Sequence, residues 1–65
     1  MSIQEAVMLF RRLGVDVPAL RRDEFSAAYH RLARRYHPDV NPNAHELMAN
    51  INAARSVILK SDRPD

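Results

Sequence analysis

The segment His37-Pro38-Asp39 places an imidazole and a carboxylate on either side of a proline. Proline fixes its own φ and disfavours the helical conformation in the residue before it, so a helix that approaches from the N-terminal side should end near His37. The two polar side chains should then face solvent. Such a pair could orient a catalytic imidazole, contribute to a metal site or contact another molecule, and the surrounding residues must decide among these.

The rest of the chain argues against catalysis and metal binding. No serine or cysteine nucleophile is placed for His37 to activate, and there is no glycine-rich phosphate loop. The segment His45-Glu46 begins like the helix of a zinc protease, but Ala49 stands where the second histidine ligand must be. We therefore predict that the chain has no catalytic residue, no metal site and no cofactor.

Length and composition limit the possible classes of protein. The chain has 65 residues and no cysteine, which predicts one small domain without disulfides that depends on helix packing. No apolar run approaches the roughly 18 residues needed to span a bilayer, and Met1-Ser2-Ile3 does not begin like a secretory signal. We expect a soluble, cytoplasmic monomer with no contact to a membrane.

The positive charge is concentrated in one part of the chain. The formal net charge is only +2, but nearly all of the ten basic residues are arginines. Such a cluster is either a solvated helix face or a surface for an anionic partner, which would be a nucleic acid or an acidic protein. Five of these arginines fall within fifteen residues: Arg21, Arg22, Arg31, Arg34 and Arg35.

The spacing of apolar and capping residues predicts a first helix over residues 2–13. Ser2 and Glu5 have the spacing of a capping box, and Gly14 stands where a left-handed C-terminal cap belongs. Residues at helical intervals should form its buried face. These residues are Ile3, Ala6, Phe10 and Leu13.

A second helix is predicted over residues 20–36, with Asp23-Glu24 in its first turn. Its apolar stripe should face the core, with the two tyrosine hydroxyls reaching the surface, while the arginines face water. The stripe consists of Phe25, Tyr29, Leu32 and Tyr36.

A proline-containing loop at 37–43 should lead into a third helix at 44–60, for which Asn43 and Glu46 are a plausible N-terminal cap. The polar tail 61–65 should fray. These elements predict an all-α domain in which the second and third helices form an antiparallel hairpin and the first packs across it. The apolar face of the third helix would consist of Leu47, Met48, Ile51, Ala54 and Ile58.

The order of these motifs resembles the J domain of DnaJ-type co-chaperones. The segment from Ala28 to Asn41 is similar to the second helix and loop of that family, Leu13-Gly14-Val15 to the end of its first helix, and Ile51-Asn52-Ala53-Ala54 to its third. The resemblance covers roughly residues 3–60. It implies a bare J domain at 1–60, without the accessory regions of the longer family members and with the short fourth helix reduced or absent.

The resemblance implies that the chain docks on a DnaK-type heat-shock ATPase and stimulates its ATP hydrolysis, so that the catalysis belongs to the partner. An exposed carboxylate at Asp39 can accept a bidentate arginine, and the basic face of the second helix can steer toward an acidic surface. Matched by position, the chaperone-binding residues would be His37, Pro38, Asp39, Tyr29, Arg31, Arg34, Arg35 and Asn41.

Several positions depart from the family pattern. Val40 stands where a basic residue is common, and Met48-Ala49 where an aromatic residue followed by a lysine is frequent. Arg55 replaces a usual tyrosine, and we expect it to form an ion pair or to lie over the edge of the core. These differences affect the expected strength of docking and not the fold.

The alternative function is a small helical domain that binds nucleic acid. The arginine-rich second helix could lie along phosphates, and helix-turn-helix proteins share the three-helix plan. Against this function, the connection before the third helix contains two prolines and is too long for a tight turn. The third helix also carries only Arg55 and Lys60 as basic residues, so we expect no nucleic-acid partner.

Overall fold

The structure is a computed structural model and describes residues 1–61. These residues form three α-helices and two short 3-10 helices. No strand is present among these residues, so the predicted all-α class is confirmed. The bounds predicted for the three long helices differ from the observed ones by one or two residues at each end. The elements are α1 (Ile3–Arg12), η1 (Val17–Ala19), α2 (Arg22–Arg35), η2 (Pro42–Ala44) and α3 (His45–Ser61).

The helix α1 is capped at both ends as its sequence predicts. The hydroxyl of Ser2 accepts a hydrogen bond from the Glu5 N–H at 3.1 Å, and the Ser2 N–H donates to the Glu5 carboxylate at 2.7 Å. Gly14 has a φ of 88°. Its N–H and that of the following residue donate to carbonyls in the last turn of α1. A residue with a Cβ would be strained at this φ, which explains the single glycine of the chain.

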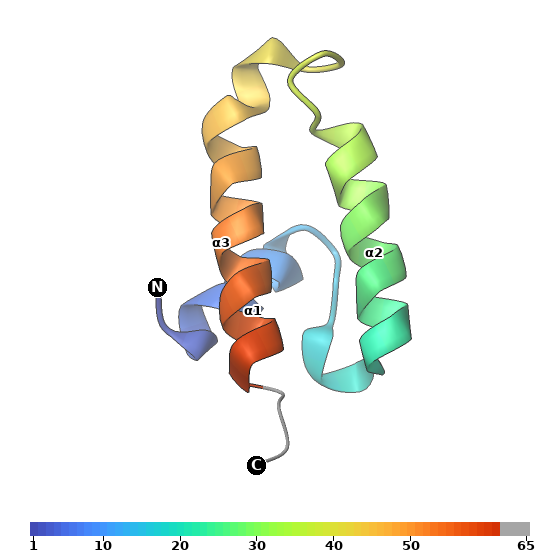
Figure 1. Cartoon of the computed structure of the whole chain (residues 1–65), viewed down its shortest axis with the longest axis vertical. Helices are drawn as coiled ribbons and strands as arrows, with labels where there is room; N and C mark the ends of the chain where they lie inside the picture. Colours follow the sequence, from blue (N-terminus) through green and yellow to red (C-terminus); the bar gives the residue numbers. More distant parts are fainter. Residues whose placement is uncertain (62–65) are drawn as a thin grey trace.

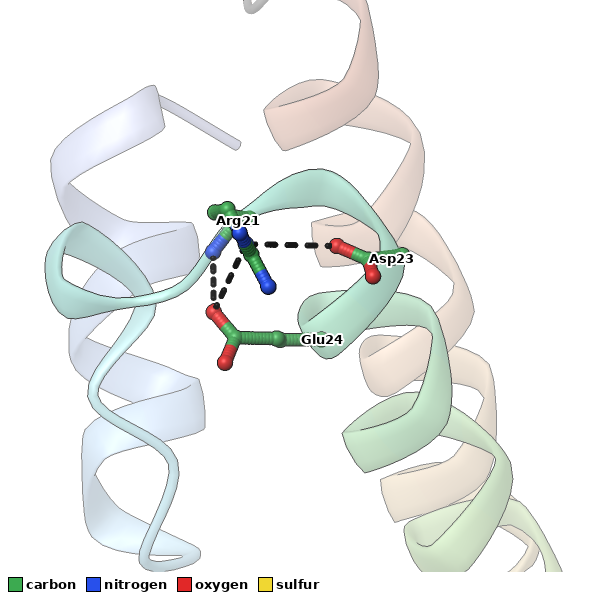
Figure 2. Close-up of polar contacts among 3 residues, drawn as sticks. All are labelled: Arg21, Asp23 and Glu24. Carbon is green, nitrogen blue, oxygen red and sulfur yellow. Dashed lines mark hydrogen bonds and ion pairs between the residues drawn. The ribbon is translucent and has the colours of Figure 1, made fainter.

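The helix α2 begins with only half of a capping box (Figure 2). The Arg21 N–H donates to Glu24 Oε1 at 2.8 Å, but an arginine side chain has no acceptor with which to bond the first turn in return. Instead, the Arg21 Nε lies 3.8 Å from Asp23 Oδ1 and 3.8 Å from Glu24 Oε1. The positive charge of Arg21 is therefore partly balanced inside its own helix turn.

The predicted cap of the third helix is wrong. Asn43 lies inside η2, and α3 begins two residues later at His45, so Asn43 does not occupy the N-cap position. Pro42 has no backbone N–H that would be left without a partner in the first turn, and its φ suits the first position of a helical turn. The chain therefore enters a 3-10 turn directly after Asn41. This turn continues into α3 without the extended cap residue that α1 and α2 both have.

The antiparallel hairpin and the crossing helix are both present (Figure 1). α2 and α3 are joined by the loop at one end of the molecule, and α1 crosses behind α3 in this view. Close backbone approach is concentrated between α1 and α3, whereas α2 is held mainly through side chains. Ala6 in α1 and Ala54 in α3 are fully buried, and such small side chains permit the close approach of two helices.

The core is built from the predicted apolar faces, with one error. The rings of Phe10 and Phe25 meet edge to face, with their centroids 5.1 Å apart, and fasten the start of α2 to α1. Ile3 was expected to be buried but is 45% exposed, because it lies in the first turn of α1 at the edge of the core. The buried cluster consists of Ala6, Phe10, Phe25, Leu32, Ile51, Ala54 and Ile58.

The C-terminal end of the described chain extends the third helix. Ser61, which was assigned to the polar tail, is the last residue of α3, and its hydroxyl donates to the Ile58 carbonyl at 2.9 Å. The rest of the predicted tail, together with the expectation of a short or absent fourth helix, concerns residues 62–65 and lies outside the described residues.

Candidate functional site

The loop between α2 and α3 is fixed by its own backbone. α2 closes at Tyr36, whose N–H still donates to the carbonyl of Leu32 at 2.9 Å. The carbonyl of His37 then accepts two hydrogen bonds, from the N–H groups of Val40 at 2.9 Å and Asn41 at 2.8 Å. Pro38 lies inside this turn, where its fixed φ removes further conformational freedom. The loop is therefore a defined turn at the end of the hairpin.

Within this turn, His37 and Asp39 face each other but divide their roles. His37 Nδ1 accepts the backbone N–H of Asp39 at 3.1 Å, a geometry that requires Nδ1 without a proton. The Asp39 carboxylate lies 3.6 Å from the same nitrogen, and its side chain is 92% exposed, against 57% for His37. The imidazole holds the backbone of the turn, and the carboxylate points into solvent.

The three arginines near the end of α2 are exposed, as predicted. Arg31, Arg34 and Arg35 lie three and four residues apart, a spacing that puts them on one helix face. Within residues 1–61, none of them makes an ion pair with a carboxylate. The Arg35 guanidinium lies 5.6 Å from the centre of the Tyr36 ring. The face is therefore positively charged and open to an anionic partner.

The side chain of Tyr29, a residue of α2, lies between α2 and α3 and away from the face that carries the three arginines. It is half-buried, and its hydroxyl donates to Asn52 Oδ1 on α3 at 2.6 Å. The Arg55 guanidinium lies over its ring, 4.7 Å from the centroid. Arg55 was expected to form an ion pair or to cover the core edge, and within residues 1–61 it does only the second; its buried Nε has no hydrogen-bond partner there. Tyr29 thus joins the two helices that carry the loop.

A hollow beside the loop contains three residues that the sequence did not assign to the site, namely His30, Ala33 and Val40. It is lined by Ala33 and Arg34 of α2 and by the loop, and it includes His30 and Val40. His30, Arg34 and His37 are four and three residues apart, and this helical spacing could have placed His30 on the same side as the His37-Pro38-Asp39 segment. Val40 could not be placed in this way, because the path of the loop depends on its hydrogen bonds.

The described residues offer little to other kinds of site. Residues 1–61 contain no group of three or more His, Cys, Asp or Glu side chains that could hold a metal ion. Over the same residues, no helix has both the length and the apolar character needed to cross a bilayer. On α3, Arg55 is stacked on Tyr29, which leaves Lys60, in the last turn, as the only other basic residue on the helix. A helix of this kind is poorly suited to reading bases.

The described residues thus form a small all-helical domain with a fixed, proline-containing loop between two antiparallel helices, beside a basic face. In a comparison with protein families, the model of the DnaJ domain matches residues 8–64, so the chain belongs to the DnaJ domain family. No solved structure gives a significant match.

Curated relatives agree with the family match. The chain is 45% identical over 53 residues to the chaperone protein DnaJ of Mycoplasma capricolum, with 78% of this chain and 14% of the relative covered. It is 50% identical over 52 residues to the chaperone protein DnaJ of Crocosphaera subtropica, covering 77% and 14%. The mitochondrial protein import protein mas5 of Schizosaccharomyces pombe is 38% identical over 55 residues, covering 85% and 13%. The chain spans about a seventh of the length of these relatives.

Proposed function

We propose that this domain is a co-chaperone module that docks on the ATPase domain of a DnaK-type heat-shock chaperone and stimulates its ATP hydrolysis. Membership of the DnaJ domain family supports the class of partner. The observation that carries the proposal is the Asp39 carboxylate, which is 92% exposed while the backbone beneath it is fixed by His37. A group that is both rigid and unshielded is suited to contact another protein.

Asp39 has the chemistry to make the central contact. A carboxylate can accept two parallel N–H bonds from an arginine, and such a pair is both stronger and more directional than a neutral hydrogen bond. Since Pro38 and the bonds to the His37 carbonyl already hold the turn, little conformational entropy is lost when the partner binds. His37 acts here as a positioning residue, and it does so through the backbone of Asp39.

The arginines supply the second part of the contact. Arg31, Arg34 and Arg35 are exposed and share one face of α2, so they can attract an acidic surface and orient the loop toward it. The resemblance also implies that Tyr29 and Asn41 belong to the chaperone-binding residues. We assign them supporting roles: Tyr29 fixes α2 to α3, and the N–H of Asn41 closes the loop.

The decisive experiment replaces Asp39 by asparagine. Asp39→Asn keeps the shape of the side chain and removes its charge, so we expect association with the chaperone to weaken by about 30-fold or more and the stimulation to disappear. The stability of the domain should change by less than about 0.5 kcal/mol, because the side chain is exposed. Single-turnover ATP hydrolysis and thermal unfolding measure the two effects. A matched control is Asp16→Asn, which removes an exposed carboxylate before η1.

The alternative of nucleic-acid binding gives a different result in the same series. A DNA or RNA complex that weakens with salt and is unchanged by Asp39→Asn would favour it over chaperone docking. Failure of the unmodified protein to stimulate any DnaK-type ATPase, or equal stimulation by the Asp39→Asn protein, would contradict the proposed function. Within the proposal, the module acts as a cytoplasmic monomer without a metal or cofactor, and it contributes contacts while the chaperone carries out the chemistry.

A further inference from the structure

Val40 is the most exposed large apolar residue among those that the structure describes. The residue is 70% exposed, compared with 45–54% for Met1, Ile3 and Met8 in and before α1. Its N–H donates to the His37 carbonyl, so the turn fixes the direction in which the residue projects. A single exposed valine is ordinary on a protein surface. Val40, however, is held in place by the turn and lies next to Asp39, so its exposed side chain is beside the group that we propose contacts the chaperone.

The surroundings of Val40 form a small apolar surface with a charged rim. The hollow beside it has the methyl group of Ala33 and the side chain of Val40 as its aliphatic members. The other members are polar: His30 and Arg34 from α2, and His37 and Asp39 from the loop. An aliphatic side chain could enter this hollow without displacing a polar group from a bond, and acidic groups beside it would meet Arg34.

We propose that Val40 and Ala33 form an apolar contact within the chaperone interface, which receives an aliphatic side chain flanked by carboxylates on the ATPase domain of the partner. Because this contact is continuous with Asp39 and the arginine face, it rests on the proposed function and specifies which partner surface fits. A polar side chain at the facing position would bind less tightly, since the methyl groups of Val40 and Ala33 offer it no hydrogen bond.

The contact has a signature that separates it from the charged contacts around it. Burial of apolar area is not screened by ions, whereas attraction between the arginines and carboxylates weakens as the Debye length shortens. Truncation of Val40 should therefore weaken association by the same factor at low and high salt. Truncation of Arg34 should weaken it mainly at low salt. Truncation of Val40 could also weaken association by changing the backbone of the loop. The variants must therefore preserve the backbone, so that a loss of association reports contact with the partner.

The test uses the full chain and a purified DnaK-type chaperone whose ATP hydrolysis it stimulates. Val40→Thr keeps the β-branched shape and replaces one methyl by a hydroxyl, so the backbone preference is retained. We expect its association to weaken about three- to fivefold, that of Val40→Ala about five- to tenfold, and that of Val40→Ile to stay within about twofold. Titrations at about 0.05 M and about 0.5 M salt should give the same factors for each variant. Met8→Ala, an exposed apolar truncation on α1, is the matched control and should have no effect.

The outcomes separate this inference from the function on which it rests. If the unmodified chain stimulates the chaperone, Asp39→Asn does not, and Val40→Thr binds as tightly as the unmodified chain, the inference is overturned and the proposed function stands. A loss in Val40→Ala that disappears at high salt, or one that Met8→Ala reproduces, also overturns it. If the unmodified chain does not stimulate any DnaK-type ATPase, both fail together.

Discussion

The two ends of α2 use the same residue type in opposite ways. At its start, Arg21 lies 3.8 Å from carboxylate oxygens of Asp23 and Glu24, so its charge is partly balanced within one turn. Near its end, Arg31, Arg34 and Arg35 have no carboxylate partner among residues 1–61. The number of arginines on a helix therefore does not define a binding surface, because a neighbouring carboxylate reduces the attraction of an arginine for another molecule.

The difference extends to how the two ends are held. The start of α2 is fastened by Phe25, which is 4% exposed and packs edge to face on Phe10. Toward the other end, Tyr29 bonds Asn52 and the loop closes on its own backbone. Both parts of α2 bury an apolar side chain, Phe25 at the start and Leu32 further along, but the second part is also joined to α3 by the Tyr29 hydrogen bond. Substitution of Phe25 should change stability, and substitution of the exposed residues near the loop should change association.

The largest expected effect is on stability, from Phe25→Ala. Removing a buried phenylalanine costs about 3–5 kcal/mol, which approaches the whole stability of a domain of this size. We expect the protein to be largely unfolded at room temperature, as measured by helical circular dichroism and urea titration. Phe25→Leu, which keeps most of the apolar volume, should remain folded and stimulate the chaperone normally. A folded Phe25→Ala protein with only reduced association would show that the two ends are not divided as described.

The next effect is on association, from reversal of the charges near the loop. Arg31→Glu combined with Arg35→Glu should weaken binding to the chaperone by about tenfold or more at low salt and by less at high salt, where screening shortens the range of the charges. The control reverses Arg21, whose charge is partly balanced within its own helix turn, and should leave association unchanged. Titrations over a range of salt measure both. An equal loss at every ionic strength would indicate a packing defect in α2 instead of lost steering.

The fold was predictable from the sequence because its signals are local. The capping box of Ser2 and Glu5, the left-handed Gly14 and the apolar stripe of α2 depend on neighbours within one or two turns. Two expectations failed, one for a local reason and one because of tertiary packing. Asn43 has the residue type of a cap, but Pro42 starts a 3-10 turn one residue earlier. Ile3 has the right spacing for the buried face but lies beyond the edge of the core.

The candidate site was predictable only in part. The His37-Pro38-Asp39 segment and the exposed arginines follow from the spacing and the resemblance. The hydrogen bond from the Asp39 N–H to His37 Nδ1 could not be predicted in this way, because it depends on the path of the turn. The same holds for Arg55, whose place over the Tyr29 ring requires α2 and α3 to be positioned first. Contacts across the hairpin arise from tertiary packing, and no pattern within one helix encodes them.

The smallest expected effect is a gain in stability at the paired end, from Arg21→Ser. The α1 capping box shows what α2 lacks, since the Ser2 hydroxyl accepts the Glu5 N–H while Arg21 has no acceptor. A serine at position 21 would complete the box with Glu24, for a gain of about 0.5–1 kcal/mol. The exposed ion pairs lost with Arg21 contribute less than about 0.5 kcal/mol, so Tm should rise by about 2–6 °C. Arg22→Ser, inside the first turn, is the control and should not raise Tm. The Arg21→Ser protein should stimulate the chaperone as well as the unmodified protein does, because the charge of Arg21 is already partly balanced within the helix. A stabilised protein with weaker stimulation would show that Arg21 also faces the partner, and the contrast between the two ends of α2 would then fail.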